Sequence, residues 1–105
     1  MARVVWSPQA LKDLEAIGDY LAREAPAYAQ AFVDGAFDAV EVLETFPHSG
    51  RAVPEIDDGA LREVIYHGYR VFHVVSEAGG ETEVDVLSVF HSTRQFGGLS
   101  GSERG

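Results

Sequence analysis

The sequence has no cysteine, a single lysine and no long apolar run. Without cysteine, the chain can form no disulfide, no thiolate nucleophile and no cysteine-bound zinc site. Its apolar runs extend over only a few residues, so we expect no segment that spans a membrane. The first ten residues also lack the apolar stretch of a secretory signal, and a cytoplasmic protein is therefore expected.

Positively charged residues are scarce, because 8 Lys and Arg stand against 17 Asp and Glu and give a formal net charge of −9. Attraction to phosphate needs clustered Lys and Arg, so we expect no direct binding of this chain alone to DNA. The segments 59–76 and 86–102 nevertheless contain Arg62, Arg70 and Arg94, and their only acidic residue is Glu63. These arginines could form a local cationic surface or lie scattered over the molecule, and composition leaves both open.

The length of 105 residues corresponds to one domain, and 46% hydrophobic with 24% charged residues is typical of a globular chain. No internal repeat or linker divides the sequence. We expect a single domain over residues 1–99 and a flexible C-terminal tail over residues 100–105, where the sequence reads Ser-Gly-Ser-Glu-Arg-Gly.

The first half of the chain has the pattern of a short strand followed by two helices. Residues 3–6 are β-prone, and Ser7-Pro8 is typical of a helix start, because serine caps a helix and proline at its first position loses no hydrogen bond. Apolar residues then recur at helical spacing until Ala25-Pro26 interrupts the pattern. A second amphipathic helix is predicted from Pro26 to Thr45. The two helices should form an antiparallel hairpin.

The second half has the composition of strands. Residues 47–60 are polar and are predicted to be a loop, and three segments rich in Val, Ile, Phe and Tyr follow at Leu61–His67, Tyr69–Glu77 and Thr82–His91. The glycines between Ala78 and Glu81 predict a hairpin turn. The predicted fold class is therefore α+β: an N-terminal strand, an antiparallel helical hairpin and a three-stranded antiparallel β-meander.

The middle predicted strand has two partly apolar faces. Alternation places Tyr69, Val71, His73 and Val75 on one face and Arg70, Phe72, Val74 and Ser76 on the other. One face should cover the helices and the other should be open to a partner, but the sequence does not decide which is which.

No residue pattern points to a cofactor, and none is expected. The four histidines do not have the spacing of metal ligands, the serines lack a nucleophile-elbow pattern, and the glycine pairs precede no helix. His73, mid-strand among apolar residues, is interpreted as a packed or edge histidine. His91 ends the last strand, where functional residues often lie, although a merely solvated strand end explains it equally well.

Four segments in order resemble the ParE/RelE superfamily of bacterial toxins from type II toxin–antitoxin pairs. They are V-V-W-S-P-Q-A-L-K-D-L continuing to I-G-D-Y-L-A, F-P-H-S-G-R, L-R-E-V with G-Y-R-V-F-H-V, and V-L-S-V-F-H-S-T-R. The resemblance covers residues 3 to about 96 and implies the small toxin fold, in agreement with the pattern above. It also implies a cognate, ParD-like antitoxin that wraps and masks the toxin. We expect its contacts at Arg62, Arg70, Phe72 and Val74.

The resemblance implies two alternative activities. RelE-like members are ribosome-dependent mRNA endoribonucleases, and their cations and acid–base group would here be Arg62, Arg70, His91 and Arg94. The tyrosine expected after the last strand is missing, and Phe96 cannot exchange a proton. ParE-like members instead inhibit DNA gyrase. The pattern V-x-H-x-x-R at the end of the last predicted strand (Val89, His91 and Arg94) resembles theirs better. We therefore expect a ParE-like toxin that acts by binding gyrase through His91, Arg94 and Phe96.

Overall fold

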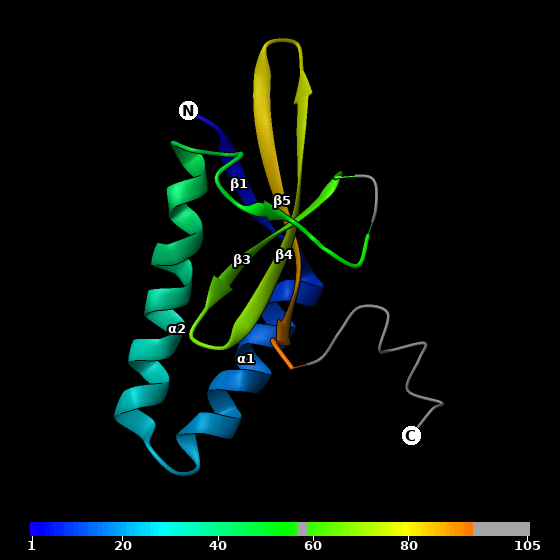
Figure 1. Ribbon diagram of the computed structural model, residues 1–105. Coiled ribbons are helices and arrows are strands. Elements are labelled where there is room, and N and C mark those ends of the chain that lie inside the picture. Colours follow the sequence, from blue (N-terminus) through cyan, green and yellow to red (C-terminus); the bar gives the residue numbers. More distant parts are fainter. Residues whose placement is uncertain (57–58, 94–105) are drawn as a thin grey trace.

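The structure, a computed structural model, describes residues 1–56 and 59–93 (Figure 1). Along the chain the elements are β1 (Arg3–Trp6), α1 (Pro8–Ala22), α2 (Pro26–Glu41), the 3₁₀ turn η1 (Val42–Glu44), β2 (Arg51–Ala52), β3 (Leu61–Tyr66), β4 (Tyr69–Ala78) and β5 (Glu81–His91). The predicted α+β class, with an N-terminal strand, a helical hairpin and a β-meander, is confirmed. The expected tail at residues 100–105 lies outside the described residues.

All five strands form one sheet in the order β1-β5-β4-β3-β2. β1 pairs with β5 in parallel, and the other neighbours are antiparallel. β2 corrects the prediction that residues 47–60 form only a loop. Arg51 and Ala52 become a strand because they pair with Glu63 and Arg62 of β3, and such a distant pairing leaves no signal in a two-residue segment.

Both helices begin as the sequence predicts. The Ser7 hydroxyl accepts a hydrogen bond from the Ala10 N–H at 3.0 Å, and proline occupies the first turn of each helix. α2 ends at Glu41, slightly before the predicted end, because the chain tightens into η1 and the Thr45 N–H bonds the carbonyl of Val42 at 3.1 Å. None of the described helices is long and apolar enough to cross a membrane.

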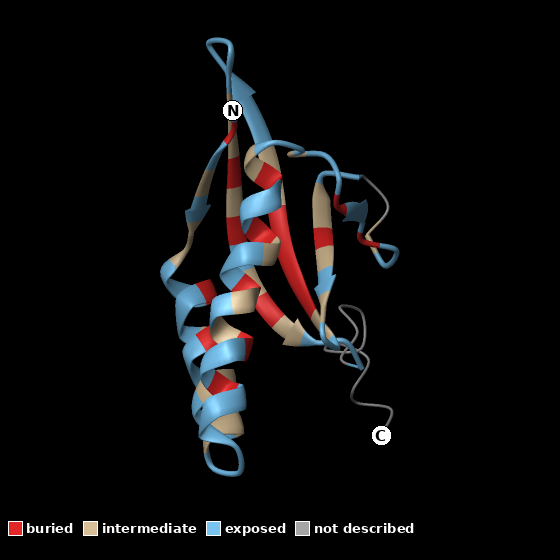
Figure 2. Cartoon of the chain, turned by 90° about the vertical axis from the view of Figure 1, so that its left-hand side faces the viewer, coloured by how far each residue is buried: buried red, intermediate tan, exposed pale blue. Residues whose placement is uncertain are grey.

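The core lies between the helical hairpin and one face of the sheet, where the buried positions of both layers meet (Figure 2). Tyr69, Val71, His73 and Val75 of β4 belong to this helix-facing side, which decides the alternative that the sequence left open. The residues buried here on the other elements include Leu14, Phe32, Ala36, Val40, Leu43, Val84, Val86 and Val89.

Two tight turns fix the register of the meander. His67 and Gly68 join β3 to β4, and Gly79 and Gly80 join β4 to β5, each with a positive φ. Two-residue turns of this kind match the twist of a hairpin, which confirms the predicted turn between Ala78 and Glu81.

Candidate functional site

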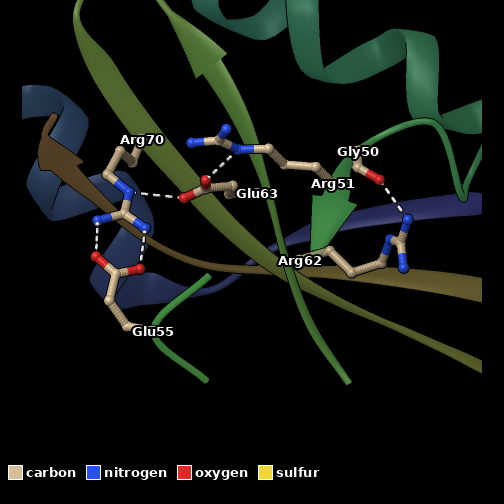
Figure 3. Close-up of polar contacts among 6 residues, drawn as sticks. All are labelled: Gly50, Arg51, Glu55, Arg62, Glu63 and Arg70. Atoms are coloured by element: carbon tan, nitrogen blue, oxygen red, sulfur yellow. Dashed lines mark hydrogen bonds and ion pairs between the residues drawn. The ribbon is translucent and has the colours of Figure 1, made fainter. Parts of the chain in front are cut away.

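A cluster of four charged side chains, which we call the ion-pair cluster, lies on the sheet face away from the helices. It consists of Arg51, Glu55, Glu63 and Arg70 (Figure 3). Arg70 donates from Nη1 and Nη2 to the two carboxylate oxygens of Glu55, at 2.9 and 2.8 Å, and from Nε to Oε1 of Glu63, at 2.6 Å. The second oxygen of Glu63, Oε2, accepts from Nε of Arg51 at 2.5 Å. The cluster therefore connects β2, β3, β4 and the segment after β2.

Burial makes the ion-pair cluster strongly interdependent. The side chains of Arg70 and Glu63 are 5% and 0% exposed. A carboxylate at such a position is tolerated only when it is paired and hydrogen-bonded, and Glu63 has a guanidinium at each oxygen. Hydrogen bonding to Glu55 raises the pKa of Arg70, although burial opposes this effect. Arg70 is thus a charged residue held by its own chain.

Two residues expected on an open sheet face are buried instead. Arg70 is 4% and Phe72 1% exposed, and the guanidinium carbon of Arg70 lies 5.0 Å from the centre of the Phe72 ring. The Phe90 ring meets Phe72 edge to face at 5.6 Å. The expectation of an open face is wrong at these positions, because Glu55 folds back onto Arg70. Antitoxin binding by Arg70 and Phe72 stays a prediction, and it would require that segment to move.

Arg62 points to the opposite side of the sheet from Arg70. In the register of β3 and β4, Arg62 pairs with His73, and both are on the helix-facing side. Arg70 pairs with Ile65, and both are on the outer face. The Arg62 guanidinium donates to the carbonyl of His48 at 3.0 Å and to that of Gly50 (Figure 3). Arg62 therefore fastens the segment that follows η1 to the sheet. The half-buried Val74 belongs to the Arg70 face.

His91 lies exposed at the end of β5, as the sequence predicts. Its ring packs in a T-shaped arrangement with the Tyr69 ring, with ring centres 5.1 Å apart, and its Nδ1 lies 2.7 Å from the Thr93 hydroxyl. Because His91 pairs with Tyr69, it is on the helix-facing side, at the first residue of β4, whereas Arg62 pairs with His73 further along the same strand. Arg94 and Phe96 lie outside the described residues.

The residues named for ribonuclease chemistry are consequently not brought together where the structure describes them. Arg70 is on the outer face, while Arg62 and His91 are on the helix-facing side, where they pair with different β4 residues, His73 and Tyr69. Both arginines are already bonded to groups of their own chain. Among the described residues, Arg62, Arg70 and His91 therefore do not share a position at which all three could contact one phosphate.

His73 is a packed histidine, one of the two alternatives drawn from the sequence. It is 0% exposed, and within residues 1–56 and 59–93 neither ring nitrogen has a hydrogen-bond partner. Burial, with a smaller effect of the nearby Arg62 charge, lowers its pKa. The same part of the chain contains no group of three or more His, Asp or Glu side chains that could hold a metal ion.

A hollow of about 520 Å³ runs between α1 and α2, and we call it the hairpin groove. Its apolar lining includes Leu14, Val33 and Phe37, and Glu15 and Asp19 add carboxylates. The helices approach closely at Gly18, where an added Cβ would lie 3.1 Å from Cγ2 of Val33. The groove depends on how the two helices pack against each other, so the sequence carries no direct signal of it.

The sequence did not predict Glu55 and Glu63 as partners of Arg70, or Arg51 as a partner of Glu63. Glu63 and Arg70 are charged residues within largely apolar strands, and this is the one signal that could have indicated a buried pair. Glu55 carries no such signal, because it precedes β3 in an irregular segment.

Comparison with known proteins covers nearly the whole chain. The family model described as the ParE toxin of the type II toxin–antitoxin system parDE matches residues 4–96. A curated relative, the toxin RelE2 of Caulobacter vibrioides, is 37% identical over 95 residues, which make up 90% of this chain and 99% of that protein.

Solved structures share the fold at lower sequence identity. A chain of the chromosomal ParDE toxin–antitoxin system from P. aeruginosa superposes with a TM-score of 0.71 at 20% identity, covering 87% of this chain and 96% of its own. The YoeB/ParE toxin from Agrobacterium tumefaciens gives a TM-score of 0.56 at 18% identity, with coverages of 85% and 97%. The family match, the curated relative and the fold agree, and the chain belongs to the ParE toxin family of type II toxin–antitoxin systems.

Proposed function

We propose that this toxin inhibits growth by binding its target rather than by cleaving RNA, that the target is DNA gyrase, and that a ParD-like antitoxin neutralises it. The observation that carries this proposal is the separation of His91 from Arg62 and Arg70. Cleavage of a phosphodiester needs an acid–base group and cations within reach of the same phosphate. A binding toxin has no such requirement.

The target contact is proposed at the C-terminal end of β5 and in the segment that follows it. His91 is exposed there, and the sequence continues to Arg94 and Phe96. Aromatic residues and arginine dominate the binding energy of many interfaces, so this segment is suited to anchor a protein target.

The antitoxin is proposed to occupy the hairpin groove as an amphipathic helix. Leu14, Val33 and Phe37 offer an apolar surface, while Glu15 and Asp19 favour a helix with Lys or Arg beside its apolar stripe. Arg62 and Val74, half-buried in the free chain, remain proposed secondary contacts. Arg70 and Phe72 would join them only if the Glu55 segment moved.

The second candidate is a RelE-like, ribosome-dependent mRNA endoribonuclease. The observation that favours it is the name of the Caulobacter relative, RelE2. In that case His91 would be the acid–base group, since its imidazole is exposed at the end of β5 and can accept and donate a proton.

Two measurements on the same toxin separate these functions. Messages from cells that express the free toxin are mapped at their 5′ ends, and purified gyrase is assayed for supercoiling with and without the toxin. We expect intact messages and inhibited supercoiling. The exposed His48 provides a control variant, His48→Ala, for His91→Ala. Codon-specific cuts that disappear only in His91→Ala, with gyrase unaffected, would establish the ribonuclease instead.

A further inference from the structure

Aromatic rings gather at the end of the sheet where β3 turns into β4 and where β5 ends (Figure 1). At their centre is the buried Phe32 of α2, whose ring centre lies 5.0 Å from that of Tyr66 and 5.4 Å from that of Tyr69. The rings around Phe32 come from four different elements and from the turn between two of them. We call them the aromatic end surface, and they are Tyr28, Tyr66, His67, Tyr69 and His91.

The inner rings of this surface are held in place, and the outer rings are open to solvent. The Tyr66 hydroxyl donates to the Phe32 carbonyl at 2.9 Å, and Tyr66 and Tyr69 are half-buried. Tyr28 packs 6.2 Å from Phe32 and is 50% exposed, and the two histidines are exposed as well. The exposed rings therefore stand on a fixed aromatic support, which lowers the entropy that a partner must overcome on binding.

His67 has a backbone conformation that does not suit its side chain. Its φ is 47°, and in residues 1–56 and 59–93 it is the one residue other than glycine with a positive φ. Gly68 follows with a φ of 84°, and a two-residue hairpin turn with two positive φ values favours Asn-Gly. Unfavourable backbone conformations of this kind often lie at functional sites. The exposed imidazole of His67 is therefore better explained by a partner than by the turn.

The turn is directly connected to the proposed target contact. The Ser92 N–H donates to the Gly68 carbonyl at 2.7 Å, and the ring of His91 packs on Tyr69 with ring centres 5.1 Å apart. The turn from β3 to β4 thus fixes the start of the segment that leaves β5. A target that binds this segment meets the aromatic end surface at the same time.

The charge of the chain indicates the chemistry of the partner. Tyrosine ring faces attract the cations of Arg and Lys, and a net charge of −9 favours a partner surface that is basic. Nucleobases also stack on aromatic rings, but their binding sites combine the rings with a positively charged groove for the phosphates. The net charge opposes such binding.

We propose that the aromatic end surface is a part of the target-binding surface, and that an Arg or Lys side chain of the target protein packs on the exposed rings of Tyr28 and His67. The inference rests on the proposed function, which places the target contact at the end of β5. It adds contacts from α2 and from the turn between β3 and β4, and it gives the partner's side chain by its chemistry.

The first test exchanges His67 for asparagine. Asparagine suits the turn better than histidine but has no ring, so His67→Asn should unfold in urea at the parent midpoint or above it. Binding to purified gyrase without DNA is measured by calorimetry, and we expect it to be about tenfold weaker, as for a central interface residue. The matched control is His48→Asn, at an exposed histidine that follows η1, and it should bind as the parent does. A histidine that served only the turn would leave binding unchanged.

The second test asks whether the ring of Tyr28 is what the partner contacts. Tyr28→Phe keeps the ring and loses the hydroxyl, whereas Tyr28→Leu keeps apolar bulk and loses the ring. Because a cation is attracted to the ring face, Tyr28→Leu should weaken gyrase binding several-fold and Tyr28→Phe should weaken it little. Equal binding by the two variants would contradict the packing of a basic side chain on Tyr28.

The outcomes separate this inference from the proposed function. If the parent binds gyrase and His67→Asn binds equally well, only the inference is overturned. If the parent does not bind gyrase, the proposed target is wrong, and growth inhibition at matched expression then tests the surface: reduced toxicity of His67→Asn supports it, and toxicity equal to that of His48→Asn overturns it. Binding of a single-stranded oligonucleotide that is lost in His67→Asn would assign the rings to nucleobases and would also overturn the inference.

Discussion

Arg70 and Glu63 form an ion pair across β4 and β3, with Nε 2.6 Å from Oε1, at a site where both side chains are almost completely buried. The remaining donors of Arg70 hold Glu55, fifteen residues earlier in the chain. The pair therefore fixes more than two strands, because it also fastens the segment after β2 to the sheet. A residue that looks like a binding arginine in the sequence is in the structure a connection between elements.

The first prediction concerns this connection. Arg70→Ala removes the partner of a buried carboxylate, and truncating one member of such a pair costs roughly 3–5 kcal/mol. We expect a loss of this size in the free energy of unfolding, measured by urea denaturation. Arg3→Ala, which removes an exposed arginine paired with Glu83, is the control and should change stability little.

This expectation changes how a toxicity assay on Arg70 is read. The sequence alone suggests that Arg70→Ala relieves growth inhibition while leaving the fold intact. The burial of Arg70 predicts instead that lost toxicity accompanies lost folded protein. A folded Arg70→Ala variant of unchanged stability that is no longer toxic would instead show that Arg70 acts directly in toxicity.

The second prediction concerns Gly50, where the backbone passes close to the sheet. A Cβ added there would lie 2.7 Å from Cε1 of His73 and 2.9 Å from the Glu63 carbonyl oxygen. Neither neighbour can move freely, because His73 is buried and the carbonyl belongs to β3. Gly50→Ala should therefore destabilise the fold by roughly 1–3 kcal/mol.

Thermal denaturation monitored by circular dichroism measures this effect. Ser49→Ala, at the exposed neighbouring position, should leave the midpoint nearly unchanged. A Gly50→Ala variant as stable as Ser49→Ala would show that the segment shifts to accommodate the methyl group.

The sequence predicts those features of the fold that depend on local interactions, and it does not predict those that depend on residues far apart in the chain. Helical spacing, the Ser7-Pro8 start and the glycine turn are local, and they give the helices and the meander correctly. β2 and the Arg70–Glu55 pair depend on residues far apart in the chain, so no local pattern indicates them. The candidate site also depends on how the strands pair. His91 and Arg70 both occur in strands, but the register of β4 and β5 places them on opposite faces of the sheet.

The third prediction tests the acidic rim of the hairpin groove. Exchanging Glu15 and Asp19 for lysine reverses the charge beside the groove and should weaken binding of a basic antitoxin helix, by roughly tenfold at low salt. The difference should shrink as salt is added, because exposed charges are screened. Affinity is measured by calorimetry at two ionic strengths. A Glu77→Lys control with an equally large effect would contradict a contact at the groove.

The last prediction uses the buried imidazole of His73. Burial disfavours its charged form, and the Arg62 guanidinium adds to this effect, so its pKa in the folded chain is below the ordinary value of 6.5. The unfolded chain therefore binds a proton at higher pH than the folded chain does. The stability that depends on neutral His73 is complete above pH 6.5 and is lost as the pH falls below it.

His73→Leu should remove this dependence, because leucine cannot be protonated and neither ring nitrogen has a hydrogen bond to lose within the described residues. Urea denaturation at several pH values between neutral and mildly acidic should show the parent chain losing up to about 1.36 kcal/mol more per pH unit than the variant. His48→Ala, which removes an exposed histidine, should keep the parent slope. Parallel curves for the parent and His73→Leu would mean that water or a rearranged neighbour solvates the ring, and that burial does not keep it neutral.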